Sequence, residues 1–143
     1  MAKDVIHDAI KNALIKDGWI ITADPFRLKY EEFDLLADLS AERTIIATKE
    51  NHHIIVEIKS FAGRSFVKEL QQALGQYEIY FDIIELTGLD YELYLAISHL
   101  TYRDFFTQKA TQMVLQRHHL RVLVVNIEEE EIVQWIKYHL IKS

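Results

Sequence analysis

The stretch 54-IIVEIKSFAG-63 decides the fold and poses the question of function. It begins with three β-branched apolar residues, which are typical of a buried strand. Glu57 and Lys59 follow with one residue between them, and because side chains alternate along a strand, both charges point to the same face. Isolated charges are costly to bury, so each must meet an opposite charge, water or a metal ion.

Two interpretations of this charged pair are open. In the first, the strand ends at solvent and Glu57 forms an ion pair with Lys59. In the second, the two side chains belong to a metal site at the strand end. Short motifs of this kind often arise by chance, so the surrounding sequence has to distinguish an ordinary strand end from a site.

The remaining sequence predicts an α/β chain of mixed α+β type. Apolar periodicity and turn residues predict helices over residues 3–16, 66–85, 101–106 and 108–118, and a last helix that begins at the acids 128–131. Strands are predicted over 19–30, 54–59, 91–98 and 120–127, with 33–40 and 43–48 as one long or bent strand. The first six elements then have the order αβββαβ, which favours a central mixed sheet with helices packed around it.

Size and composition predict one domain that spans residues 1–143. Half of the 143 residues are hydrophobic, which excludes a disordered chain, and no apolar run approaches the ~20 residues of a membrane span. The N-terminus shows no apolar signal-peptide segment. The absence of cysteine excludes disulfides, thiolate metal sites and a cysteine nucleophile, and it fits a cytoplasmic protein.

The charge of the chain limits what it binds alone. Its formal net charge is -6, whereas dedicated DNA-binding domains are usually basic, because phosphate contacts supply most of their non-specific affinity. This acidity counts against tight, autonomous DNA binding. It does not exclude weak or partner-assisted action on DNA, since acidic metal ligands contribute to the total.

Upstream acids support the metal-site interpretation. Asp34 and Asp38 precede the charged pair, and in a regular strand both would point to one face. Mg²⁺ and Mn²⁺ prefer oxygen ligands and are often held by carboxylates, and a neighbouring lysine can orient water or stabilise charge on a phosphoryl group. A regular tight hairpin at 49–53 would place Glu57 opposite residues 46–48, so Asp38 reaches Glu57 only if the long strand bends.

These residues resemble the PD-(D/E)xK nuclease superfamily, whose restriction endonuclease-like fold has the αβββαβ core order. The resemblance implies that Asp38 and Glu57 bind Mg²⁺ or Mn²⁺, with the carbonyl oxygen of Ile58 completing the metal shell. It also implies that Lys59 assists hydrolysis as a base or by orienting water. Asp34 competes with Asp38 for the role of first ligand.

The resemblance extends to two predicted helices. Gln76 and Tyr80 lie four residues apart, on one face of the 66–85 helix, and they match the Gln-x-x-x-Tyr signature of RecB-like members of the superfamily. In the first helix, where many members place a glutamate, His7 is the catalytic candidate of this chain. The ordinary alternatives are an exposed Gln76, a half-buried Tyr80 in the core and a structural His7.

A more specific resemblance covers nearly the whole chain. The segments 11-KNALIKDGWIITADP-25, 34-DLLADLSAERTIIATKE-50, 55-IVEIKSF-61, 73-ALGQ-76, 93-LYLAIS-98 and 131-EIVQWIK-137 resemble the XisH family of fdxN element excision controlling factors of cyanobacteria. This resemblance implies a role in controlling the excision of a DNA element during heterocyst differentiation, with DNA and a small XisI-type protein as partners. One departure lies at Glu31 and Glu32, where we expect glycines.

Two functions therefore compete. The first is a Mg²⁺-dependent endonuclease, or an accessory protein, in programmed DNA element excision. The second is a non-catalytic regulator that binds an XisI-type partner and guides a separate recombinase. Aromatic and apolar side chains in 101–106 offer a surface for a homodimer.

Overall fold

The described part of the molecule is built on one six-stranded sheet. The structure is a computed structural model that describes residues 2–35 and 42–139. The strands lie in the order β1 (Ile20–Ala23), β4 (Arg43–Lys49), β5 (His52–Ile58), β6 (Glu92–Ser98), β7 (Arg121–Asn126) and β8 (Glu131–Lys137). β1, β4 and β5 are antiparallel neighbours, β5, β6 and β7 are parallel, and β8 returns antiparallel to β7. The expected mixed sheet is confirmed.

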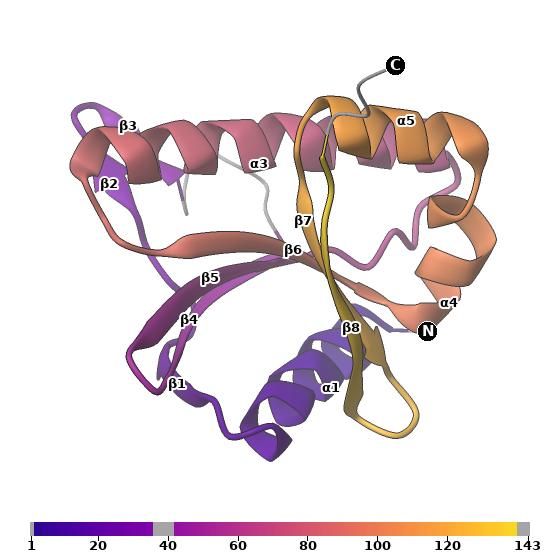
Figure 1. The fold of residues 1–143 in the computed structure, drawn as a ribbon, viewed down its shortest axis with the longest axis horizontal. Coiled ribbons are helices and arrows are strands. Elements are labelled where there is room, and N and C mark those ends of the chain that lie inside the picture. The colour runs from indigo at the N-terminus through magenta and orange to yellow at the C-terminus, as the bar shows by residue number, and fades with distance from the viewer. Residues whose placement is uncertain (1, 36–41, 140–143) are drawn as a thin grey trace.

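Helices cover both faces of this sheet (Figure 1). α1 (Lys3–Lys16) packs on one face, and α3 (Phe66–Thr87) and α5 (Lys109–Arg117) pack on the other. α4 (His99–Thr101) and the π-helix η1 (Tyr102–Phe106) connect β6 to α5. The main-sheet elements α1, β1, β4, β5, α3 and β6 follow the predicted αβββαβ order. Within the described ranges, no helix is both long and apolar enough to cross a membrane.

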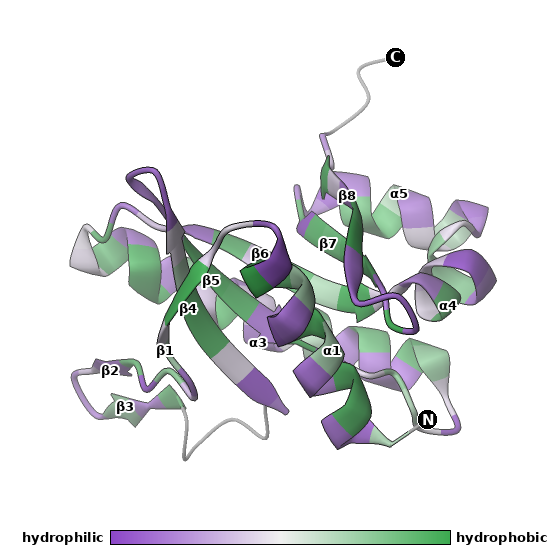
Figure 2. Cartoon of the chain, turned by 90° about the horizontal axis from the view of Figure 1, so that it is seen from below, coloured by the Kyte–Doolittle hydropathy of each residue, from purple (hydrophilic) through white to green (hydrophobic). Residues whose placement is uncertain are grey.

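The strand β5 is buried on both faces and separates two apolar cores. Ile54, Val56 and Ile58 pack in the core that contains α1, whereas Ile55 packs in the core that contains α3. Each of these four side chains is at most 3% exposed. Figure 2 shows the corresponding pattern of apolar central strands and polar turns. By the same alternation Glu57 faces the core beneath α3, and not solvent.

Capping residues fix the ends of α3 as the sequence predicts. The hydroxyl of Ser65 accepts a hydrogen bond from the backbone N–H of Lys68 (3.3 Å), which satisfies one of the free donors of the first turn. Gly88 ends the helix with φ +70°, a left-handed conformation that glycine adopts without strain. α3 therefore spans the sheet with a fixed position over β5 and β6.

A two-residue turn sets the register of β5. Glu50 and Asn51 both have positive φ, +49° and +69°, which is the backbone conformation of the tightest hairpin turns. The turn is shorter than expected, and the register places Glu57 opposite Thr44, and not opposite residues 46–48. Glu57 therefore lies near the beginning of β4.

The strand predicted over 19–30 is shorter than expected. β1 ends at Ala23, two residues before Pro25, which has no N–H group to continue the ladder. The backbone N–H of Phe26 still donates to the carbonyl of Thr44 (2.6 Å), so the chain stays beside β4 before it leaves the sheet.

The long strand predicted over 33–48 is wrong. Its beginning lies in β3 (Phe33–Asp34), which pairs with β2 (Lys29–Tyr30) in a separate two-stranded ribbon, and only β4 joins the main sheet. Glu31 in the turn of this ribbon has φ +50°. Glycine adopts that conformation most readily, and this is one of the two positions where glycine is expected. Asp38 lies outside the described residues.

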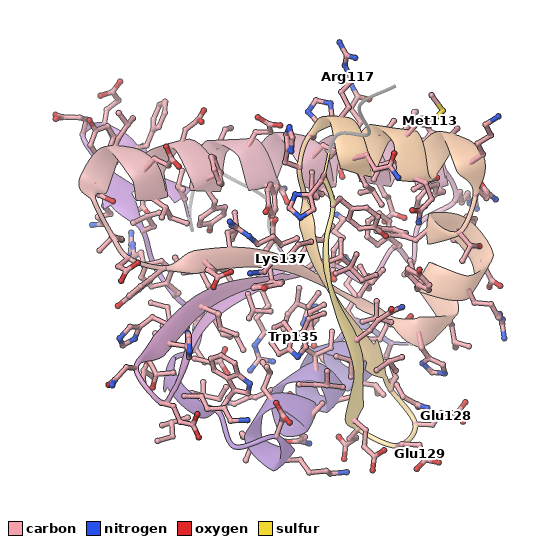
Figure 3. The ribbon with its side chains drawn as sticks, viewed as in Figure 1. Met113, Arg117, Glu128, Glu129, Trp135 and Lys137 are labelled. Carbon is pink, nitrogen blue, oxygen red and sulfur yellow. The ribbon has the colours of Figure 1, made fainter. Side chains whose placement is uncertain are left out.

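The helix predicted from residues 128–131 onward is also wrong, because Glu131–Lys137 form β8. The side-chain oxygen of Asn126 accepts hydrogen bonds from the backbone N–H groups of Glu128 and Glu129, at 3.1 Å each. This arrangement builds a turn, and not the start of a helix. Figure 3 shows both glutamates at the tip of the β7–β8 turn.

A β-bulge explains why the sequence of β8 imitates a helix. The register between β7 and β8 shifts at Val133, which is an extra residue in β8. As a result Ile132 and Trp135 pack in the same core although they are three residues apart, and Ile136 packs in the other. Apolar residues three apart on one face are otherwise typical of a helix.

The segment 101–106 faces the interior more than expected. Phe106 is fully buried, and Phe105 stacks on Phe66 with ring centroids 4.6 Å apart. These rings pack against the core beneath α3, which leaves Phe105 only partly exposed. The homodimer stays a prediction.

Replacement of Glu50 tests the hairpin register. Because asparagine tolerates the left-handed conformation better than glutamate, Glu50→Asn should raise the free energy of unfolding by about 0.5 kcal/mol in urea titrations. Glu85→Asn, at an exposed position of α3, is the matched control. It should change the free energy of unfolding by less than about 0.5 kcal/mol, because the poorer helix propensity of asparagine and the loss of an acid near the helix C-terminus act in opposite directions. A destabilising Glu50→Asn would contradict the positive φ of this turn.

Candidate functional site

Glu57 combines deep burial with missing hydrogen-bond partners. It is 1% exposed, and neither carboxylate oxygen has a partner among the described residues. Its neighbours in the sheet are Thr44 on β4 and Leu95 on β6. Burial raises the pKa of Glu57 to about 8, although the positive charge of Lys59 acts in the opposite direction. A carboxylate in such surroundings is unfavourable unless a proton or another cation neutralises it.

α3 places polar side chains on the face towards which Glu57 points. Gln76 is 9% exposed, and its Oε1 atom has no partner within the described part of the chain. Tyr80 lies one turn further along and accepts a hydrogen bond from the hydroxyl of Thr44 (3.4 Å). Burial raises the pKa of Tyr80, the Thr44 bond lowers it, and the charges of Glu57 and Asp34 raise it further. The structure thus brings Tyr80 and Thr44 to Glu57, with Gln76 on the same side of α3.

Lys59 is paired with Glu42, and the ion pair with Glu57 expected in the simpler interpretation is not formed. The Lys59 ammonium lies 3.9 Å from Oε1 of Glu42, and the two side chains are 8% and 5% exposed. The same carboxylate accepts hydrogen bonds from the backbone N–H (3.1 Å) and the hydroxyl (2.8 Å) of Ser60, and lies 2.9 Å from Nε2 of His7. Burial raises the pKa of Glu42, but the bonds from His7 and Ser60 lower it below its ordinary range.

His7 is connected to the site through Glu42. α1 holds the imidazole nearly buried, with the carboxylate of Glu42 between it and the hydroxyl of Ser60. A nucleophilic triad needs the imidazole against the hydroxyl, so this arrangement does not activate Ser60. The predicted catalytic role of His7 stays a prediction, and what the structure shows is a contact that ties α1 to the partner of Lys59.

Two other predicted metal ligands, Asp34 and Ile58, do not share the buried surroundings of the Glu57 carboxylate in the described structure. Asp34 lies on β3, its side chain is 21% exposed, and it forms an ion pair with Arg27. The next residue, Leu35, packs in the core that contains α3, so β3 lies on the α3 side of the sheet, and the charge of Asp34 helps to raise the pKa of Tyr80. Ile58 directly follows Glu57 at the end of β5, with its side chain buried on the α1 side. Asp38 lies in the segment that the structure does not describe.

The chemistry of the open acceptors fits a hard divalent cation. The Glu57 carboxylate and the Gln76 Oε1 atom are oxygen acceptors without donors among the described residues, and Mg²⁺ and Mn²⁺ prefer such ligands. Within residues 2–35 and 42–139, no group of three or more His, Cys, Asp or Glu side chains is arranged to hold a metal ion. A cation at Glu57 would therefore be held by fewer than three such side chains, unless Asp38, which lies outside the described residues, contributes.

Three residues of this region were not predicted from the sequence. Thr44 was missed because the expected hairpin register was wrong. Ser60 lies within the quoted stretch, but a serine after a strand gives no specific signal. Glu42 lies just before β4 and is held by His7 of α1, a contact across 35 residues that no strand pattern contains.

A mixed sheet between helices, with a buried carboxylate at the end of a central strand, defines an α+β protein with an acidic side chain buried in the part of the core that the structure describes. Within this class the chain belongs to the XisH family, because the family model described as XisH protein matches residues 1–133. A search among curated proteins finds no match.

Solved structures of relatives have the same fold. An XisH family protein from Nostoc punctiforme PCC 73102 is 35% identical, with a TM-score of 0.85, and the match covers 94% of this chain and 100% of that chain. A fdxN element excision controlling factor protein from Anabaena variabilis is 34% identical, with a TM-score of 0.86 and the same coverage. The expected family and the expected mixed fold are confirmed, whereas the PD-(D/E)xK relationship stays a prediction.

The pH dependence of stability tests the environment of Glu57. Its folded pKa of about 8 exceeds the ordinary 4.5, so the folded state binds the proton more tightly and loses stability as pH rises from 4.5 to 8. Glu57→Gln cannot ionise, and with a chelator present it should unfold with a free energy on the order of 3 kcal/mol above that of the parent at pH 8. The difference should shrink towards pH 5.

Urea titrations at several pH values measure this difference. Glu85→Gln, at an exposed position of α3, is the matched control and should leave the pH dependence of the parent unchanged. A Glu57→Gln protein that is no more stable than the parent at pH 8 would show that Glu57 has donors in the folded chain.

Proposed function

We propose that this protein acts on DNA as a Mg²⁺- or Mn²⁺-dependent endonuclease of the PD-(D/E)xK type, in the excision of a DNA element. The observation that carries this proposal is the Glu57 carboxylate, which is buried, has no hydrogen-bond partner among the described residues and lies within reach of the Lys59 charge. A buried acid without donors favours a cation as its partner. A cationic lysine beside it favours a phosphate group as the substrate.

The metal ion would be held by oxygen atoms alone. Glu57 and the carbonyl oxygen of Ile58 would supply two of them, and Asp38 or Asp34 would supply a second carboxylate. When bound, the ion would act as a Lewis acid on the phosphodiester.

The remaining side chains of the site would orient water and shield Glu57 from bulk solvent. The Lys59 ammonium would lie against the scissile phosphate, where it orients water or neutralises charge. Gln76 would use its open Oε1 atom to accept a hydrogen bond from a water molecule. Tyr80, held by Thr44 on the neighbouring strand, would exclude bulk water from the inner side of Glu57.

The biological context of the proposal comes from a relative. The protein from Anabaena variabilis is described as a fdxN element excision controlling factor, and it is 34% identical over 94% of this chain. We infer that this chain acts in the excision of a comparable DNA element, with an XisI-type protein as its partner.

A second candidate function is a non-catalytic regulator that binds the XisI-type partner and guides a separate recombinase. Its support is the charge of the chain, which is -6 in total. Lys11 on α1 and Arg43 at the start of β4 are both paired with Asp24 and so are not free for phosphate groups. A chain of this charge would bind DNA weakly alone, and the partner would supply the DNA contacts.

Metal binding and cleavage test the endonuclease proposal. The parent should bind Mn²⁺ in calorimetry and nick plasmid DNA in the presence of Mn²⁺ and the partner. Glu57→Gln should weaken Mn²⁺ binding at least about tenfold, or 1.4 kcal/mol, because it removes the ligand charge. Lys59→Met should abolish cleavage and leave Mn²⁺ binding intact, whereas the matched control Lys137→Met, on the exposed edge strand β8, should change neither.

Other outcomes separate the two candidate functions. If the parent binds no Mn²⁺ and cuts no DNA, but forms a stable complex with the partner in size-exclusion chromatography, the regulator is correct. If Lys59→Met cuts DNA as well as the parent, the proposed role of Lys59 is wrong.

Paired substitutions identify the second carboxylate. If Asp38 is the ligand, Asp38→Asn should weaken Mn²⁺ binding at least about tenfold, and Asp34→Asn should have little effect. Because Asp34 is paired with Arg27, Arg27→Met is the control for loss of that ion pair. A loss in Asp34→Asn that Arg27→Met does not share would assign the role to Asp34.

A further inference from the structure

The charge of Lys59 acts on two buried carboxylates, Glu42 and Glu57, and only Glu42 is its ion-pair partner. The ammonium forms an ion pair with Glu42 at 3.9 Å and, among the described residues, with no other acid. Glu57 lies two residues earlier in the chain, within β5, and its carboxylate oxygens have no partner in the described ranges. The nearest acid in sequence is therefore not the acid that holds the lysine.

The position of Glu42 is fixed from three sides. It contacts His7 on α1 at 2.9 Å, and it accepts the backbone N–H and the hydroxyl of Ser60 after β5. Its side chain is 5% exposed. Hydrogen bonds to a charged acceptor are stronger than those between neutral groups, so this carboxylate cannot move towards another cation without losing several bonds.

A buried lysine needs an anionic partner. If Glu42 were neutral, Lys59 would be left beside Glu57, on which its charge already acts, and the two would form the ion pair that the sequence alone suggests. That pair would block Glu57 as a ligand, because a cation would have to displace the ammonium first. The fixed charge of Glu42 therefore decides whether Glu57 stays open.

We infer that Glu42 is a positioning residue that holds Lys59 away from Glu57 and so keeps the Glu57 carboxylate open for a divalent cation. His7 and Ser60 act through Glu42 by fixing its carboxylate. This inference rests on the proposed function insofar as the cation is the ligand of Glu57. It differs from that function because Glu42 is not itself a ligand or a catalytic residue.

Mn²⁺ calorimetry on single and double variants tests this positioning role. Glu42→Gln should weaken Mn²⁺ binding about tenfold or more, because Lys59 then competes as an opposite charge within ~4–6 Å of Glu57. The double variant Glu42→Gln/Lys59→Met should bind Mn²⁺ as tightly as Lys59→Met alone, since the competing ammonium is gone. This rescue by a second substitution is the decisive result, because a residue that only supports the fold would not give it.

Matched controls separate positioning from folding. Glu92→Gln removes the acid of an exposed ion pair with Lys137 (3.2 Å) and should leave Mn²⁺ binding unchanged. Ser60→Ala removes one bond to Glu42 but keeps its charge, and should weaken binding less than Glu42→Gln. If Glu42→Gln does not fold, Glu42→Asp draws the carboxylate back from Lys59 and should change affinity in the same direction.

Two results would overturn the inference. One is a folded Glu42→Gln protein that binds Mn²⁺ as tightly as the parent, and the other is a double variant that binds as weakly as Glu42→Gln. If the parent itself binds no Mn²⁺, the proposed function fails, and the crystal structure of Glu42→Gln then decides the positioning role alone. That crystal structure should show the Lys59 ammonium in contact with Glu57. A Lys59 side chain that stays beside residue 42 would refute the positioning role of Glu42.

Discussion

The burial of β5 on both faces is the constraint on which the rest of the structure depends. A central strand between two apolar layers allows polar side chains only where a specific partner compensates them. Ile54 and Ile55 are apolar and pack into opposite cores without any such partner. Glu57 is polar, and its carboxylate has no compensating partner among the described residues. The end of β5 is therefore a point where the described contacts do not favour the stability of the fold.

The two carboxylates near Lys59 illustrate opposite solutions to that constraint. Glu42 is charged and surrounded by donors from α1 and from the chain after β5, so its negative charge is stable in place. Glu57 lies on the core side of the sheet with its acceptors open. Residues that break a local rule of stability without compensation are often found at functional sites. The contrast with the neighbouring Glu42 is what singles out Glu57.

Local patterns predicted most of the fold but not the register. The helices α1 and α3 were predictable because their apolar spacing and capping residues are local signals, and β5 to β7 because their apolar runs are long. The separate ribbon of β2 and β3 was not, since only tertiary packing divides 33–48. Strand alternation singled out Glu57 and Lys59 as candidates, and the resemblance added Gln76 and Tyr80. Glu42 depends on a contact across 35 residues with His7, which no local pattern contains.

The bulge in β8 affects how readily the edge of the sheet can pair with another chain. β8 is the last strand of the sheet, so one side of its backbone has no neighbouring strand in the described structure. A regular apolar edge would be a template for another chain. The extra residue Val133 interrupts the repeat of donors and acceptors along this edge, and Glu131 and Lys137 place charges at both ends of it. The sheet therefore ends at an edge that resists growth into larger assemblies.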